Sequence, residues 1–260
     1  MASDQLHITL IQPDIKWEDK QANLDQYEQY ISELGTKKQV VVLPEMFSTG
    51  FSMAVTRLGE PMDGPTVQWM KMVSAKHRCI LTGSLIIGED GFYFNRLLWV
   101  QPDGQVHYYD KRHLFAYADE DEHFTRGEKR VIVQVNGWRI NLQVCYDLRF
   151  PVFVRNQESD YDVILYVANW PERRSLAWKT LLQARAIENQ SFVVGVNRVG
   201  NDGNNIHYNG DSSVFGPLGE TIWQYPSVPV MHTVVLDKTT LHDARSHFPF
   251  LKDVDKFIIL

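Results

Sequence analysis

Short apolar runs typical of buried β-strands recur along most of this 260-residue chain, and they restrict the fold more than any other feature. Three junctions between or after these runs have the glycine that tight turns require: Pro102-Asp103-Gly104, Asn136-Gly137 and Pro217-Leu218-Gly219. The predicted strands are residues 6–12, 39–44, 79–87, 93–101, 105–110, 131–135, 138–145, 161–168 and 191–198.

Helical patterns alternate with the predicted strands. They are expected at residues 19–34, 65–77 and 174–190. Helices between strands predict sheets that are covered by helices, and the hairpins predict mixed rather than purely parallel pairing. We therefore predict one mixed α/β (α+β) domain over residues 1–260, in which the polar segment 199–210 forms a long loop.

Charge and cysteine content exclude several classes of protein. The formal net charge is −6 and no basic stripe is present, so nucleic acid is not an expected partner. No apolar stretch approaches the length of a membrane span, and the segment MASDQLHITLIQ does not resemble a signal peptide. Two cysteines are too few for a disulfide framework or a structural zinc site, so we expect a cytoplasmic protein. The densest positive groups are the pairs Lys37-Lys38, Lys111-Arg112 and Arg173-Arg174.

Cys145 is the strongest candidate nucleophile. It ends the apolar run 138–145 and is followed at once by polar residues, which is typical of a strand that runs into a sharp turn. The backbone N–H groups after it can bind an oxyanion if a helix begins near Pro151. The alternative is a buried structural cysteine, which is the commoner environment of a free thiol.

Glu45 and Lys111 occupy the same kind of position, each just past a strand-like run. A carboxylate against apolar surface can accept a thiol proton and later activate water. An ammonium beside the thiol favours thiolate and stabilises the charge of a tetrahedral intermediate. Each residue alone can also be a solvated strand end. Because the carboxyl ends of strands can meet at one edge of a sheet, we expect both residues beside Cys145.

Three segments resemble the catalytic motifs of the nitrilase superfamily of carbon–nitrogen hydrolases: VVLPEMF (41–47), YDKRHLF (109–115) and VCYDLRFP (144–151). Residues 184–200 and 210–220 resemble later segments of the same family, so the resemblance covers nearly the whole chain. It implies a four-layer α-β-β-α sandwich, no metal and no organic cofactor. It also implies a homodimer or a larger homo-oligomer.

The resemblance also assigns roles. It makes Glu45 the general base, Lys111 the electrostatic stabiliser and Cys145 the nucleophile, which matches the roles inferred from the residues themselves. Glu120 resembles the second glutamate of the family, which orients the lysine and can contact substrate, although any acid of 119–122 is a candidate. The alternative for this stretch is a solvated acidic loop.

The segments CYDLRFP and YVANWP (166–171) most resemble the omega-amidase group. This group cleaves the terminal amide of small 2-oxo dicarboxylate monoamides such as 2-oxoglutaramate and 2-oxosuccinamate. Arg149 can bind the carboxylate of such a substrate through two parallel hydrogen bonds, unless it forms a structural salt bridge with Asp147 or another acid. Large aromatic side chains more often belong to the hydrophobic core than to a pocket wall. The aromatic candidates for the pocket wall are Phe47, Phe115, Tyr146 and Trp170.

Three alternatives stay open. The chain can be another small-amide hydrolase of the same superfamily, acting on deaminated glutathione or an N-carbamoyl amine, whereas direct nitrile hydrolysis is less expected. A Cys-His hydrolase would use His113 or His123 as its base. A non-enzymatic scaffold of the same fold would have no need for Glu45, Lys111 and Cys145 together.

Overall fold

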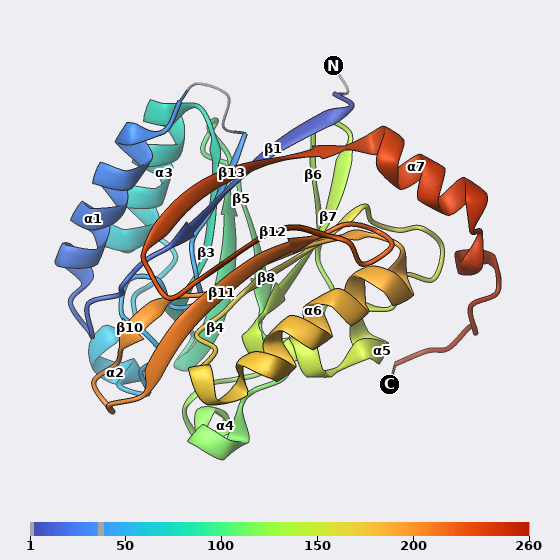
Figure 1. The fold of residues 1–260 in the computed structure, drawn as a ribbon. Coiled ribbons are helices and arrows are strands. Elements are labelled where there is room, and N and C mark those ends of the chain that lie inside the picture. The colour runs from blue at the N-terminus through green and yellow to red at the C-terminus, as the bar shows by residue number, and fades with distance from the viewer. Residues whose placement is uncertain (1–2, 36–38, 260) are drawn as a thin grey trace.

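Two β-sheets packed face to face form the centre of the structure (Figure 1). The computed structural model describes residues 3–35 and 39–259, so the Lys37-Lys38 pair lies outside the described residues. Helices cover the outer face of each sheet. The predicted mixed α/β fold and its four-layer α-β-β-α arrangement are confirmed.

The first sheet has the strand order β13-β1-β2-β3-β4-β5. The pairs β1–β2 and β2–β3 are parallel, and the other pairs are antiparallel. The strands are β1 (Gln5–Gln12), β2 (Val40–Val42), β3 (Ile80–Glu89), β4 (Phe92–Val100), β5 (Val106–Asp110) and β13 (Val230–Asp237).

The second sheet has the order β10-β11-β9-β8-β7-β6, with β12 also paired to β11. Its centre, β7–β8–β9, is parallel and its outer pairs are antiparallel, so the predicted mixed pairing is confirmed. The strands are β6 (Ile132–Val135), β7 (Trp138–Val144), β8 (Val163–Val167), β9 (Phe192–Val196), β10 (Val199–Asn201), β11 (His207–Phe215) and β12 (Thr221–Pro226).

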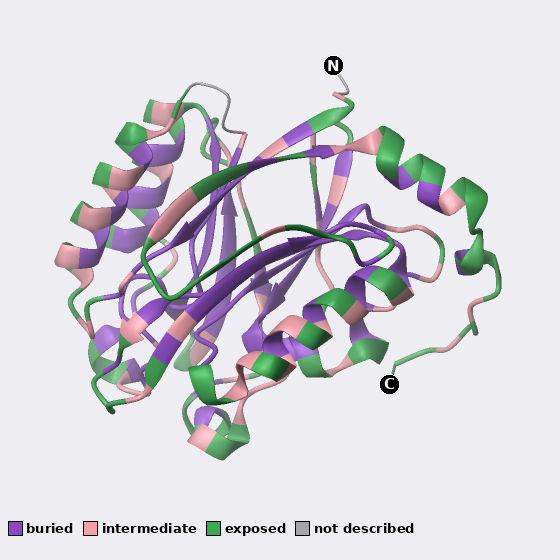
Figure 2. Ribbon diagram, in the orientation of Figure 1, coloured by how far each residue is buried: buried purple, intermediate pink, exposed green. Residues whose placement is uncertain are grey.

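Alternation along the strands separates the two sides of the first sheet. In and just after β2, Val40 and Val42 join the core between the sheets, whereas Val41 and Leu43 pack toward helices α1 (Lys20–Glu33) and α3 (Pro65–His77). On the opposite side, α6 (Ser175–Asn189) covers the second sheet. Figure 2 shows buried strands between helices whose outer faces are exposed.

All nine predicted strands and all three predicted helices are present, with ends that differ by a few residues. The turn chemistry is also confirmed: Asn136 (φ 49°) and Gly137 (φ 83°) both have left-handed backbone between β6 and β7. The predicted loop 199–210 is wrong, because β10 and the start of β11 take up most of it. Three further strands, β11, β12 and β13, and helix α7 (Lys238–His247) follow without a sequence prediction.

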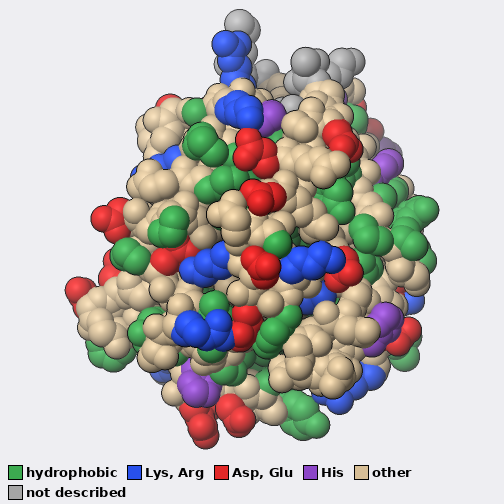
Figure 3. Space-filling view, turned by 90° about the vertical axis from the view of Figure 1, so that its left-hand side faces the viewer, with side chains coloured by type: hydrophobic (Ala, Val, Ile, Leu, Met, Phe, Trp, Pro, Cys, Tyr) green, Lys and Arg blue, Asp and Glu red, His purple; other side chains and the backbone are tan. Residues whose placement is uncertain are grey.

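The outer surface over α1 and α3 carries charges of both signs. Figure 3 shows Lys and Arg side chains interspersed with Asp and Glu on this face. One such pair joins the two helices, since Lys76 Nζ lies 2.7 Å from Glu28 Oε1. None of the helices in the described part of the chain combines the length and the apolar character that crossing a bilayer requires.

The core between the sheets gives the first prediction. Leu142 on β7 is fully buried there, so Leu142→Ala should lower the free energy of unfolding by about 2–5 kcal/mol in urea titration. Val235→Ala on the outer strand β13, where the side chain is 46% exposed, is the control and should cost less than about 1 kcal/mol. Equal losses in the two variants would contradict this placement of the core.

Candidate active site

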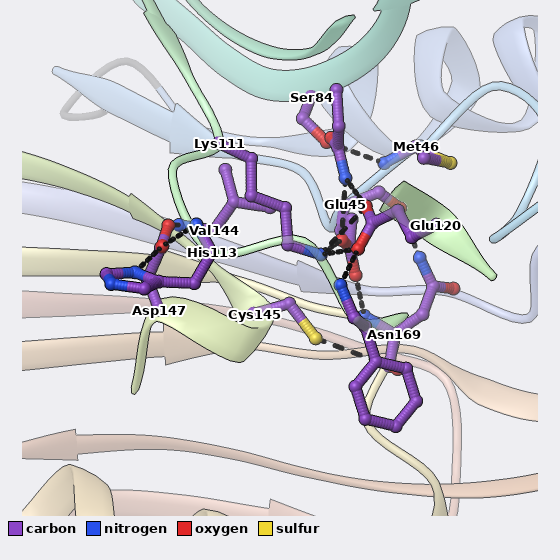
Figure 4. Close-up of polar contacts among 12 residues, drawn as sticks. Glu45, Met46, Ser84, Lys111, His113, Glu120, Val144, Cys145, Asp147 and Asn169 are labelled. Atoms are coloured by element: carbon purple, nitrogen blue, oxygen red, sulfur yellow. Dashed lines mark hydrogen bonds and ion pairs between the residues drawn. The ribbon is translucent and has the colours of Figure 1, made fainter. Parts of the chain in front are cut away.

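Four polar residues lie just beyond the carboxyl ends of strands from both sheets. Glu45 follows β2 and Lys111 follows β5 in the first sheet, whereas Cys145 follows β7 and Asn169 follows β8 in the second. Their side chains gather at one place (Figure 4). The structure therefore brings Glu45, Lys111 and Cys145 together, as the sequence predicted.

The backbone bends sharply at two of these strand ends. Met46 (φ 42°) and Cys145 (φ 44°) both have left-handed backbone, which is uncommon for residues other than glycine. Cys145 opens a 3₁₀ turn that ends at Arg149, and the short helix α5 (Pro151–Val154) follows at the expected residue. Inside this turn, Asp147 Oδ2 accepts a hydrogen bond from the backbone N–H of Val144 at 3.0 Å. The bend presents the Cys145 side chain at the strand end.

Lys111 is the centre of a buried charged cluster. Its Nζ donates to Glu45 Oε1 at 2.9 Å and to both oxygens of Glu120 at 2.8 and 3.0 Å. All three side chains are fully buried. Burial alone lowers the pKa of Lys111, but the charges of Glu120 and Glu45 outweigh burial and raise that pKa above its ordinary value. Lys111 is therefore an ammonium.

The structure decides which acid of 119–122 belongs to the site. Glu120, at the start of the short helix α4 (Glu120–His123), is buried against Lys111, whereas the other three acids of this stretch are exposed. The Phe115 backbone N–H donates to Glu120 Oε2 at 2.6 Å. Burial raises the pKa of Glu120, although Lys111 opposes this effect. Lys111, Asn95 and the Phe115 N–H occupy both oxygens of Glu120, so its position fits support of Lys111 better than direct contact with substrate.

Asn95 and Asn169 hold the carboxylates from two sides. Asn95 Nδ2, on β4, donates to Glu45 Oε1 at 2.8 Å and to Glu120 Oε1 at 3.0 Å. The backbone N–H of Asn169 donates to Glu45 Oε2 at 2.9 Å, and its Nδ2 donates to the Glu45 carbonyl at 2.6 Å. Neither asparagine was expected from the sequence. Asn169 satisfies the same strand-end rule as Glu45, whereas Asn95 is a polar residue inside an otherwise largely apolar strand.

Cys145 carries a protonated thiol in this environment. Burial raises the pKa of the Cys145 thiol, and the neighbouring Glu45 carboxylate raises it further, while Lys111 lowers it by less. Lys111 thus favours the thiolate, as the sequence predicts, but burial and Glu45 outweigh it. The Sγ atom lies 3.9 Å from the Asn169 carbonyl oxygen, to which the thiol donates a long hydrogen bond.

A cavity of about 240 Å³ opens over Cys145 and Lys111. Four of the predicted binding residues line it: Phe115, Tyr146, Arg149 and Trp170. Phe47 does not, because its ring packs against Tyr27 and Trp69 in the core beneath α1 and α3, so that prediction is wrong. The lining residues that the sequence did not indicate are Phe51, Tyr117, Ala118, Asn169, Pro171, Arg173, Arg174, Ile206 and Tyr208.

Arg149 does not pair with Asp147, the alternative that the sequence left open. Asp147 instead accepts hydrogen bonds from Tyr109, His113 and the backbone of Val144. Within residues 3–35 and 39–259, no acid lies at ion-pair distance from Arg149. Its guanidinium lies 4.9 Å from the centre of the Trp170 ring.

The histidines do not border the reacting thiol. His113 Nδ1 donates to Asp147 Oδ1 at 2.7 Å and its ring stacks on Phe150, and His123 is exposed on α4. No histidine appears among the described residues that line the cavity. In the whole described part of the chain, no three or more His, Cys, Asp or Glu side chains are arranged to hold a metal ion.

Comparisons with known proteins agree with this geometry. A family model described as carbon-nitrogen hydrolase matches residues 7–240. The chain is 46% identical over 253 residues to "Omega-amidase YafV" of Escherichia coli (strain K12), covering 97% of this chain and 98% of that protein. It is 29% identical over 253 residues to the "2-oxoglutaramate amidase" of Bacillus subtilis (strain 168), covering 96% and 97%.

The solved structures include XC1258 from Xanthomonas campestris, a CN-hydrolase superfamily protein with an arsenic adduct in its active site. The two structures superpose with a TM-score of 0.96 at 44% sequence identity, covering 98% of this chain and 99% of that one. The match to the family extends over almost all of the described strands and helices. This chain belongs to the carbon-nitrogen hydrolase family.

Proposed function

We propose that this chain is an omega-amidase, which cleaves the terminal amide of short 2-oxo dicarboxylate monoamides such as 2-oxoglutaramate and 2-oxosuccinamate. The products are the dicarboxylate and ammonia. Two relatives carry names of this activity and align over nearly the full length of the chain. In this proposal Cys145 is the nucleophile, Glu45 the general base and Lys111 the electrostatic stabiliser.

The two buried carboxylates accept different numbers of hydrogen bonds, and this difference identifies Glu45 as the general base. A carboxylate offers about four acceptor positions. Glu120 receives four contacts, two from Lys111 and one each from Asn95 and the Phe115 backbone. Glu45 receives three, and only one of them reaches Oε2. Glu45 Oε2 therefore keeps an acceptor position for the Cys145 proton, whereas Glu120 is committed to Lys111.

The first half of the reaction forms a thioester. Glu45 accepts the thiol proton as the Cys145 sulfur attacks the amide carbon. The Lys111 ammonium, which borders the cavity, and the Tyr146 backbone N–H receive the negative charge on the substrate oxygen. Glu45 then gives its proton to the amide nitrogen, the carbon–nitrogen bond breaks and ammonia leaves.

The second half releases the acid. Glu45 takes a proton from water, and the resulting hydroxide attacks the thioester carbonyl. The carbon–sulfur bond breaks and Glu45 returns the proton to the sulfur, so the enzyme regains its resting state. Two steps with lower barriers replace one direct attack of water on an amide.

The cavity supports a short acidic substrate. Its volume of about 240 Å³ is below the range of about 300–1,000 Å³ typical of pockets for drug-sized ligands. This size speaks against the larger substrate of a deaminated glutathione amidase. Arg149 lines the same cavity and has its guanidinium available for a carboxylate.

We also infer a single folding unit, a cytoplasmic location and a homodimer or larger homo-oligomer. Antiparallel pairing of β1 with β13 joins the two ends of the described chain, which supports one unit. Two cysteines are too few for a disulfide framework, which fits a reducing compartment. Leu176 and Ile187 on α6 are exposed apolar side chains of the kind that an interface covers. Sedimentation velocity measures the assembly.

Ammonia release from 2-oxoglutaramate tests the activity itself. Purified wild type should release ammonia, and Cys145→Ala should release none above background, because the thioester cannot form. A coupled assay for ammonia measures both. Absence of release by the wild type from this substrate, with release from an N-carbamoyl amine, would contradict the proposed substrate class.

Glu45→Gln separates the proposed base from histidine. The variant keeps the size of the side chain but cannot accept a proton, so kcat for 2-oxoglutaramate should fall by about 10²–10⁴-fold. The control is His113→Ala combined with His123→Ala, which should retain most of kcat. The opposite pattern would identify a Cys-His hydrolase.

Alkylation by iodoacetamide tests the state of the thiol. Cys145 is 9% exposed beside the cavity and should be labelled, whereas Cys79 is 1% exposed in the core under α3 and should not. In Glu45→Gln the labelling of Cys145 should rise at lower pH than in the wild type, because removing that negative charge lowers the Cys145 pKa. Peptide mass spectrometry across a pH series measures both thiols. Equal labelling of the two thiols in the folded protein would count against Cys145.

A further inference from the structure

Three arginines line the cavity over Cys145: Arg149, Arg173 and Arg174. In the described parts of the chain, none of the three has an acid within ion-pair distance. An exposed arginine without a partner is ordinary, and Arg149 and Arg173 are exposed. Arg174 is different, because it is only partly exposed and still has no acid to balance its charge.

The Arg174 guanidinium is anchored at the cavity wall. It lies 5.0 Å from the centre of the Phe115 ring, and Phe115 in turn packs against Tyr146, beside the nucleophile. Trp170 Nε1 donates to the Arg174 carbonyl at 2.8 Å, which fixes the backbone at this residue. The Arg149 guanidinium lies over the Trp170 ring, with 4.9 Å between the guanidinium carbon and the ring centre. Two guanidiniums are thus held on different aromatic residues of one cavity.

The surroundings leave the charge of Arg174 uncompensated. Burial, followed by repulsion from Arg173, lowers the pKa of Arg174, and Arg149 adds to this repulsion. Nearby acids do not relieve it. Asp211 accepts hydrogen bonds from Ser175 and Asn209 and lies 3.6 Å from Lys179, and Glu172 is exposed outside the cavity lining. An anion in the cavity would offset the cost of these neighbouring positive charges.

We propose that Arg174 is a second carboxylate-binding residue of the active-site cavity, acting together with Arg149. This inference rests on the proposed function and deepens it. One guanidinium that binds a carboxylate in a forked manner uses one acceptor position on each oxygen, so both oxygens can accept from a second guanidinium. The site then selects short amides with a carboxylate at the far end, and neutral amides gain nothing from either arginine.

Binding of glutarate provides a test that does not depend on turnover. This dicarboxylate is the probe, and calorimetric titration gives its Kd for the wild type, Arg149→Gln, Arg174→Gln and Arg173→Gln. We expect Kd to rise at least about tenfold in the Arg149 and Arg174 variants, which is the usual size of a lost charged hydrogen bond. Arg173→Gln is the matched comparison: it removes the same charge one position earlier, from another side chain of the cavity lining, and it should raise Kd less than Arg174→Gln does.

Kinetics provide the second readout. In Arg174→Gln, KM for 2-oxoglutaramate should rise in parallel with Kd for glutarate while kcat changes less than about threefold, because the carboxylate lies away from the reacting bond. The rate at which neutral iodoacetamide labels Cys145 should stay within about twofold of the wild type, which checks that the site is folded.

Three results would overturn the assignment. The first is a Kd for glutarate in Arg174→Gln equal to that of the wild type. The second is a rise of Kd in Arg173→Gln as large as in Arg174→Gln. The third is no binding of glutarate to the wild type. If the wild type binds glutarate through Arg174 but releases no ammonia from 2-oxoglutaramate, the anion site is supported and the proposed function is contradicted. If the wild type turns over 2-oxoglutaramate but Arg174→Gln changes neither Kd nor KM, the function is supported and the anion site is contradicted.

Discussion

One ammonium shared between two carboxylates, all withdrawn from water, is the interaction on which the rest of the site depends. Removing such charges from water costs several kcal/mol per ion unless every group is paired and hydrogen-bonded. Asn95 and the backbone N–H groups of Phe115 and Asn169 supply the missing donors. Because burial and the neighbouring Glu45 outweigh Lys111, the pKa of the Cys145 thiol is raised and the thiol keeps its proton until substrate arrives.

This cluster exists only where the two sheets meet. Glu45 comes from the end of β2 in the first sheet, and Asn169, which binds it, comes from the end of β8 in the second. A second bond between the sheets lies nearby, since the Tyr109 hydroxyl donates to Asp147 Oδ2 at 2.8 Å in the turn after Cys145. The packing of the two sheets against each other therefore also positions the nucleophile. Nothing in either sheet alone would hold the base next to the thiol.

The sequence predicts the parts of this arrangement that are local. An apolar strand that changes abruptly to a charged residue is visible in one stretch of chain, and this rule finds Glu45, Lys111 and Cys145. It cannot find Asn95, which lies inside a strand, or the importance of Arg174, which depends on the absence of an acid around it in space. Strand β11 escapes prediction for the same reason. Its polar side chains are satisfied by residues outside the strand, as where Ser212 Oγ accepts from the Asn197 N–H at 2.9 Å.

The pairing of β1 with β13 has a consequence for how the chain is made. Thr9 and Thr233, which share a hydrogen bond at 2.9 Å, are 224 positions apart in sequence. On the ribosome, β1 emerges long before its partner β13, so an apolar strand edge stays unpaired while the chain between them is made. An unpaired strand edge is a template for pairing with another chain, so the nascent polypeptide is exposed to aggregation at β1 until β13 arrives.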